Sequence, residues 1–244
     1  MIPSPPRLLA QALWVVLFML FFGPVPGGAR PPGALPFDDV ARASRTLQAE
    51  WAEVFYHQSR AEQGDRYQSL LDRVRVLKAQ HSDRAEPLIV EAIILCTARA
   101  ASLGLDTIEG LEQARGLLEK ALTIDPKALE GAAYVTLGNL YRRLPGWPIL
   151  YGDRTIARSY LMNGVKQLPD GIDTNYFLGD FLLEEGDIKA ALPYLEKAAS
   201  APIRPSLRVS DEHVHEEAVI RLGEARSGQS SHSDVFDLFT PSFR

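Results

Sequence analysis

The stretch from Asn175 to Ala198 decides the fold, and it reads NYFLGDFLLEEGDIKAALPYLEKA. Its apolar residues recur at spacings of three and four, a period typical of helices that bury one face. Gly186 supplies the backbone freedom of a turn, and Asp187 can accept hydrogen bonds from the first N–H groups of a following helix. The stretch therefore predicts two helices that meet at Gly186-Asp187.

Small residues in the same stretch predict that the two helices pack closely and antiparallel. Backbones approach only where the facing side chains are small, and Gly179, Ala191 and Ala198 stand at suitable places, with leucines filling the space between. Pro193 conflicts with this scheme, because inside a helix it removes an N–H donor and pushes against the preceding turn. We expect a bend or a late helix start at Pro193.

This order of residues resembles the tetratricopeptide repeat family, whose unit of about 34 residues carries Leu-Gly, then Ala, a large residue, Ala and Pro. The matching residues are Leu178, Gly179, Ala191, Leu195, Ala198 and, slightly early, Pro202. A second copy contains Leu137-Gly138 and Ala157, and Ala157 lies one family period before Ala191. The resemblance implies an all-α fold, a right-handed superhelical array of antiparallel helix pairs, or TPR-like α-solenoid.

The helical periodicity extends over most of the chain and predicts its domain organisation. After a signal peptide at 1–29, a helical repeat domain spans 30–226 and a flexible tail spans 227–244. The approximate repeats are 37–81, 86–126, 131–169 and 172–203, followed by a capping helix at 210–226. In the first repeat, we expect the helices to join at Gly64-Asp65. In the capping helix, Val214, Ala218, Val219 and Leu222 are expected inside, and His213, Glu216, Glu217 and Glu224 mostly outside.

The N-terminal segment predicts export. Arg7 precedes an apolar run from Leu8 to Phe22, and Gly27 and Ala29 offer small residues for cleavage before Arg30. The pattern predicts a periplasmic or secreted protein whose signal peptide is cleaved after Ala29. The alternative is an uncleaved anchor in the inner membrane, for which the run is somewhat short, since a spanning helix needs about 20 apolar residues.

Several classes of function find no support in the composition and motifs. The formal net charge is -5 and no basic stripe is present, which argues against a nucleic-acid partner. Cys96 lies among apolar residues and reads as a small buried hydrophobe. His213 and His215 are two positions apart and would point to different helix faces, so a metal site is not predicted. We predict no catalytic residue, no cofactor and no enzyme activity.

The resemblance also implies where a partner binds, because the first helix of each repeat lines the concave wall of such an array. The residues that would face this groove are Asn139, Arg142, Arg143, Tyr176 and Asp180. Peptide-clamping relatives grip a terminal carboxylate with Asn after Gly and with basic residues, which Asn139 and Arg142 match in part. Val135 and Asp180 depart from that clamp. Alternatively, Arg142 and Arg143 are solvated charges at a helix C-terminus.

The connection at 144–153 is the other candidate for binding a partner. It is about seven residues longer than the family unit allows, and it places Trp147, Ile149 and Tyr151 on a Pro- and Gly-rich loop. Such loops present an interaction surface or fold over a groove. We favour the alternative that Trp147 packs back on the helices, because a lone Trp on a loop is usually partly buried.

These patterns lead to two functional hypotheses. The first is a non-catalytic protein–protein interaction scaffold of the bacterial cell envelope, which holds a protein or peptide in its concave groove. The second is a periplasmic accessory protein for solute uptake that binds a small ligand or a solute-binding protein. It follows from a looser resemblance to the T-component proteins of TRAP-type transporters, which lies in the long connection ending in Gly152-Asp153.

Overall fold

The computed structural model describes residues 37–100 and 105–228, and within these residues the secondary structure is entirely helical. The predicted signal peptide and the aromatic residues of the predicted tail lie outside this part of the chain. The helices are α2 (Phe37–His57), α3 (Arg60–Gln80), α4 (Glu86–Ala100), α5 (Leu105–Ile124), α6 (Ala128–Arg143), α7 (Arg154–Gln167), α8 (Ile172–Glu184), α9 (Ile188–Ser200), the short 3₁₀ helix η1 (Pro205–Leu207) and α10 (Arg208–Ser227).

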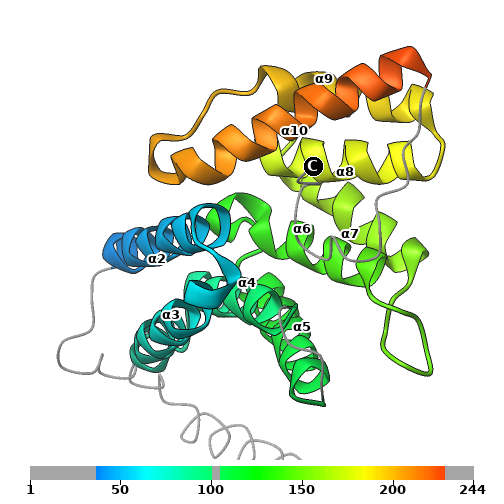
Figure 1. Cartoon of the computed structure of the whole chain (residues 1–244). Coiled ribbons are helices and arrows are strands. Elements are labelled where there is room, and N and C mark those ends of the chain that lie inside the picture. The colour runs from blue at the N-terminus through cyan, green and yellow to red at the C-terminus, as the bar shows by residue number, and fades with distance from the viewer. Residues whose placement is uncertain (1–36, 101–104, 229–244) are drawn as a thin grey trace, which may run out of the picture. The chain divides into compact units, whose positions relative to one another are not determined.

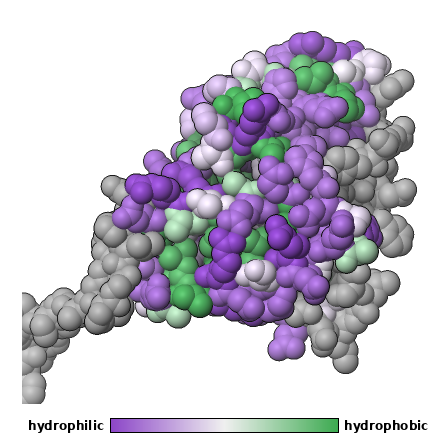
Figure 2. Space-filling model, turned by 60° about the vertical axis from the view of Figure 1, so that its left-hand side comes forward, coloured by the Kyte–Doolittle hydropathy of each residue, from purple (hydrophilic) through white to green (hydrophobic). Residues whose placement is uncertain are grey.

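Each helix packs against the next one in the chain, and the pairs stack through their first members (Figure 1). Helix α2 contacts α4, α4 contacts α6, and α6 contacts α8. Helix α10 lies along α8 and α9 and returns to contact α2, the first described helix. The buried apolar residues of all these helices form one continuous core. Hydrophilic residues cover most of the face shown in Figure 2, with smaller apolar areas among them.

In two of the helix pairs, a glycine allows the two helices to pack closely. A side-chain carbon at Gly179 would lie 2.8 Å from Cγ of Leu195, and one at Gly138 would lie 2.6 Å from Cδ2 of Leu161. Both leucines are buried. The expectation that Gly179 lets α8 approach α9 is therefore confirmed, and Gly138 has the same role between α6 and α7.

The first turn of α6 departs from ordinary helical geometry. Leu129, Glu130 and Gly131 have φ angles of 46°, 52° and 74°, in the left-handed region. A left-handed turn costs a residue with a side chain roughly 1–2 kcal/mol, so surrounding contacts must hold Leu129 and Glu130 in place. Leu129 is buried in the core, and the Glu130 carboxylate accepts a hydrogen bond from Arg45 on α2.

The predicted junction of the first helix pair is wrong. Helix α2 ends at His57 and α3 begins at Arg60, so Gly64 lies inside α3. The Glu62 carboxylate accepts hydrogen bonds from the N–H and the hydroxyl of Ser59, which caps α3. The Gln63 amide donates to the backbone carbonyls of Val54 and Phe55, in the last turn of α2, and of Gln58, just after it. Side-chain caps, rather than a glycine, therefore set this boundary.

Two smaller expectations fail in part. Helix α9 begins at Ile188, well before Pro193, so a late start at the proline is wrong. The Asp187 carboxylate, which accepts from the Ala190 N–H, starts the helix early. On α10, Val214, Ala218 and Leu222 are buried as expected, but Val219 is half exposed and Glu217 is buried. The buried face is rotated from the predicted one because α10 packs against α2 as well as α8 and α9.

Candidate functional site

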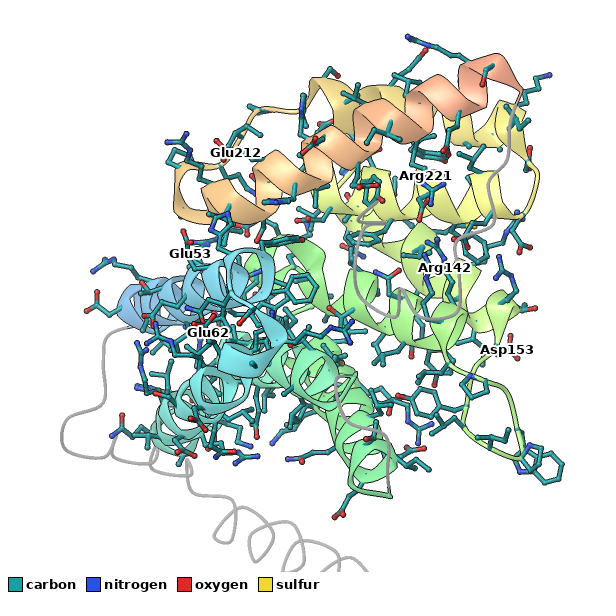
Figure 3. All side chains as sticks on the ribbon, viewed as in Figure 1. Glu53, Glu62, Arg142, Asp153, Glu212 and Arg221 are labelled. Carbon is teal, nitrogen blue, oxygen red and sulfur yellow. The ribbon has the colours of Figure 1, made fainter. Side chains whose placement is uncertain are left out.

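Arginines and carboxylates from three helices meet in a cluster between α6, α8 and α10. Arg142 on α6 donates from Nε to Oε2 of Glu184 over 2.8 Å and also contacts Asp180. Arg143 reaches Glu184 over 3.1 Å, and Arg221 on α10 reaches Asp180 over 3.0 Å. We call these five residues the ion cluster. Figure 3 shows Arg142 and Arg221 approaching α8 from its two sides.

The ion cluster is buried. None of the surface of the Arg142 side chain is accessible to solvent. Burial by itself lowers the pKa of the Arg142 guanidinium, but Asp180 and Glu184 outweigh that effect and the net shift is upward. Arg142 therefore stays charged, and the two carboxylates one helical turn apart on α8 compensate its charge.

The expectation that the predicted groove residues are exposed is wrong. The structure does bring Arg142, Arg143 and Asp180 together, but Arg142, Asp180 and Tyr176 are buried and only 13% of the Arg143 side chain is exposed. Opposite charges on neighbouring helices attract these side chains into the interface instead of leaving them to solvent. The alternative of solvated arginines at a helix end is wrong for the same reason. Asn139 is also buried, and it lies elsewhere, in the wall of a cavity.

That cavity, with a volume of about 100 Å³, lies between the first helices of the pairs and α10. Its apolar wall includes Trp51 of α2, Ile93 of α4, Val135 of α6, Phe177 of α8 and Val214 of α10. Trp51 is held by a hydrogen bond of 2.9 Å from its indole Nε1 to the Thr97 hydroxyl. Because five helices supply the wall, the cavity is a product of the whole helical stack.

Two polar atoms in the cavity wall are without partners. Oε1 of Gln48 and Oγ of Ser210 are buried and make no hydrogen bond. Asn139, which is nine-tenths buried, adds a polar amide to the same wall. Buried polar atoms are normally paired, so unpaired groups that face one cavity need an explanation.

The only formal charges among the residues that line this cavity belong to Asp173 and Arg204. Nη2 of Arg204 lies 2.7 Å from Oδ2 of Asp173 and 2.6 Å from Oδ1 of the buried Asp211. Burial raises the pKa of Asp173, and the neighbouring Arg204 opposes part of that shift. Arg204 thus bridges the two carboxylates, and its single positive charge offsets one of their two negative charges.

Contacts between α2 and the segment around α10 join the two elements that carry Trp51 and Val214 of the cavity wall. The rings of Tyr56 and His213 stack with their centroids 4.1 Å apart. Glu130, in its left-handed turn, contacts Arg45 on α2 and lies 3.7 Å from Arg204. These residues are distant in sequence, so no local pattern indicates that they meet.

The loop at 144–153 has a well-ordered base. The Gly152 N–H donates to the Pro145 carbonyl over 3.0 Å, and the Asp153 N–H donates to the Tyr141 carbonyl over 2.8 Å. The Tyr151 hydroxyl donates to the Leu111 carbonyl over 3.0 Å, and the Arg115 guanidinium lies 4.5 Å from the Tyr151 ring centroid. Tyr151, predicted to contact a partner, thus holds the loop against α5.

The tip of the same loop is exposed. Trp147 exposes 89% of its surface and Ile149 exposes 66%. The interpretation that Trp147 packs back on the helices is therefore wrong. Backbone hydrogen bonds hold the base of the loop and also its tip, where the Gly146 carbonyl accepts from the N–H groups of Ile149 and Leu150. Tyr151 is drawn inward, whereas the side chains of Trp147 and Ile149 stay exposed.

Cysteine and histidine positions add little chemistry to these sites. Cys96 is buried in the cavity wall, and burial raises the pKa of its thiol, which confirms the interpretation of a small buried hydrophobe. Within the described ranges, no group of three or more His, Cys, Asp and Glu side chains is placed to hold a metal ion. In the same ranges, no helix is both long and apolar enough to cross a membrane.

Sequence reasoning missed most of the cavity wall. On α6 the lining residues are Ala132, Val135, Thr136 and Asn139, which share one helix face. Polar Thr136 and Asn139 next to apolar positions on that face are a signal that points to the cavity. For Trp51, Tyr56 and Arg204 there is no such signal, because their role depends on how α2 meets the segment before α10.

The described residues thus define an all-helical protein of nine packed α-helices. Comparison with known proteins identifies no family. No protein-family model matches the sequence, and a search of curated proteins finds no match.

Proposed function

We propose that this protein is a non-catalytic interaction scaffold of the bacterial cell envelope, built from tetratricopeptide-like helix pairs. The sequential pairing of the helices and the glycine contacts at Gly138 and Gly179 support the repeat architecture. One observation carries the binding role: Trp147 is exposed at the tip of a loop whose base is fixed by hydrogen bonds. Exposed Trp on a preorganised loop loses little conformational entropy on binding, and Trp is enriched among the residues that dominate interfaces.

The proposed partner surface is the loop tip, not the groove of the sequence hypothesis. Arg142, Arg143 and Asp180 would have to leave the ion cluster before they contacted a partner, and breaking a buried ion pair costs about 3–5 kcal/mol. Trp147 and Ile149 need no rearrangement, since they are already exposed. The partner that fits them is a folded protein with an apolar pocket for an indole ring.

Affinity capture from an envelope extract of the source cells tests this proposal. The Trp147→Ala variant is expected to recover at least tenfold less of the partner than the unchanged chain, since hot-spot residues contribute about 2 kcal/mol or more. Val76→Ala is the matched control, because Val76 is an exposed apolar residue on α3. Equal partner recovery by both variants would contradict the loop assignment. If the Asn139→Ala variant lost the partner and the Trp147→Ala variant kept it, the groove rather than the loop tip would be the binding site.

The proposed location is the periplasm or the extracellular space, after cleavage behind Ala29. The support for it is the apolar run from Leu8 to Phe22 with small residues before Arg30. N-terminal sequencing of the protein from its own cells tests the cleavage: a chain that begins at Arg30 is expected. A chain that retains Leu8–Phe22 and sediments with the inner membrane would show the alternative, a membrane-anchored form.

A second candidate function is a periplasmic accessory protein for solute uptake, similar to TRAP transporter T-components. The cavity with its unpaired Gln48 and Ser210 atoms favours it, because these groups suit a small ligand. Native mass spectrometry of protein purified from its own periplasm separates the two candidates. A co-purifying small molecule is expected for the solute-handling function, and its absence would count against that function.

A further inference from the structure

The size of the cavity limits what it can hold. At about 100 Å³ it is smaller than an engineered apolar cavity of about 150 Å³ that binds benzene. An occupant of roughly four to six non-hydrogen atoms fits without movement of the wall. Trp51, Phe177 and Val135 give this occupant an apolar surface to contact.

The unpaired polar atoms define the chemistry of the occupant more closely. Gln48 Oε1 can only accept a hydrogen bond, so it needs a donor. The Ser210 hydroxyl both donates and accepts, and the Asn139 amide does the same. Ser210 is nine-tenths buried and lines the cavity, as does Asn139. A molecule with a hydroxyl or amide group pairs with these atoms, whereas a pure hydrocarbon leaves them unpaired.

The charges in the wall exclude an anionic occupant. Arg204 is already paired with Asp173 and Asp211 at distances of 2.7 and 2.6 Å. No cation in the wall is left over for a carboxylate ligand, because these two carboxylates already outnumber the one guanidinium. A buried anion without a counter-charge loses its hydration with little return.

We propose that this cavity is a binding site for a small, largely apolar molecule that carries a hydroxyl or amide group and no negative charge. Trp51 and Phe177 contact its apolar body, and Gln48, Asn139 and Ser210 hydrogen-bond its polar group. The site is separate from the Trp147 loop. This proposal rests on the second candidate function in one respect: both require that the protein binds a small ligand.

Three probe molecules of similar size test the chemistry: 2-methylpropan-1-ol, 2-methylpropanoate and 2-methylbutane. Each is titrated into the purified full chain at pH 7 while methyl resonances of Ile93, Val135 and Val214 are followed by NMR. The alcohol is expected to produce saturable shifts with a dissociation constant of about 1 mM. The carboxylate and the alkane are expected to bind at least about fivefold more weakly, the factor that corresponds to one net hydrogen bond.

Two substitutions locate the polar contacts. Ser210→Ala and Gln48→Leu each remove one unpaired atom and are expected to weaken alcohol binding about fivefold. Ser227→Ala is the matched control on the same helix, since its hydroxyl is exposed and donates to the Glu224 carbonyl. This control is expected to bind the alcohol as the unchanged chain does. Circular dichroism confirms that each variant is folded, and either cavity variant suffices for the test.

Three outcomes would overturn the proposal. Equal affinity for alcohol and carboxylate would show that charge is not excluded. Equal affinity for alcohol and alkane would show that the unpaired atoms do not select the ligand. No saturable shift with any probe would mean that water alone fills the cavity. Because the probes need no natural solute, a failed search for a co-purifying ligand sinks the second candidate function without affecting this result.

Discussion

Arg142 and Trp147 lie five positions apart, and the sequence made both candidates for binding a partner. The structure gives them opposite environments, with Arg142 fully buried in the ion cluster and Trp147 almost fully exposed on the loop. This reverses the usual behaviour of a charged and an aromatic residue. The difference teaches that burial here follows the available partners: Arg142 has carboxylates on the adjacent helix, whereas the Trp147 side chain points away from its loop and 89% of its surface is exposed.

Removing the buried charge of Arg142 gives the largest expected effect and tests its side of this comparison. Arg142→Ala is expected to lower the free energy of unfolding by about 3–5 kcal/mol, because Asp180 and Glu184 remain buried with less compensation. Urea unfolding followed by circular dichroism measures it. Arg42→Ala is the control, since Arg42 is exposed and paired only with Asp39, and little change is expected. Equal effects of the two substitutions would show that Arg142 is solvated.

Glycines on two helices test the close approach of α8 and α9. Gly179→Ala is expected to destabilise the protein by about 1–3 kcal/mol, because the added carbon would overlap Leu195. At Gly223 on α10 no atom lies within 4 Å of the added carbon. Gly223→Ala is therefore expected to stabilise the helix by about 0.5–1 kcal/mol. Urea midpoints give both values, and the same sign for both would contradict the close approach of α8 and α9.

Glu217 also bears on the comparison of buried and exposed side chains, because it is a buried carboxylate beside the ion cluster. Burial raises its pKa to about 7, with Arg221 opposing the shift and Asp180, Glu216 and Glu224 adding to it. Because the pKa is raised in the folded state, folding favours the protonated form of Glu217. Its contribution to stability is therefore complete below pH 4.5 and is lost as the pH rises through 7.

Glu217→Gln is therefore expected to stabilise the protein by about 1–3 kcal/mol at pH 8 relative to the unchanged chain. Near pH 4.5 the advantage is expected to be small. Urea unfolding at a series of pH values measures the difference. An advantage that does not grow between pH 5 and 8 would show that Glu217 titrates as an exposed carboxylate.

The smallest effect on stability is expected at Trp147, the exposed residue of the comparison. Trp147→Ala is expected to change the free energy of unfolding by less than about 0.5 kcal/mol, because the indole contacts little of the protein. The thermal unfolding midpoint measures it. Partner capture should fall in the same variant, which separates binding from folding. A loss of stability above about 1 kcal/mol would mean that the indole packs against the helices in solution.

The sequence predicted the elements that depend on local patterns. The period of apolar residues indicated the helices, and Gly186-Asp187 and Gly179 correctly marked a turn and a close contact. It failed where side chains from distant elements decide the outcome. Ser59, Glu62 and Gln63 moved a boundary away from Gly64, and Asp180 drew Arg142 and Arg221 inward. The cavity depends on contacts between α2 and α10, which no local spacing encodes.

The packing of α10 against α2 has a consequence for how the protein unfolds. In an open array each repeat contacts only its neighbours, so the outermost helices fray first and unfolding proceeds from the ends. Here α2 and α10 support each other through Tyr56 and His213, and neither described end is left with only one neighbour. The helices should therefore lose their structure together. A repeat inserted between α5 and α6 would separate α2 from α10 and restore the gradual behaviour of an open array.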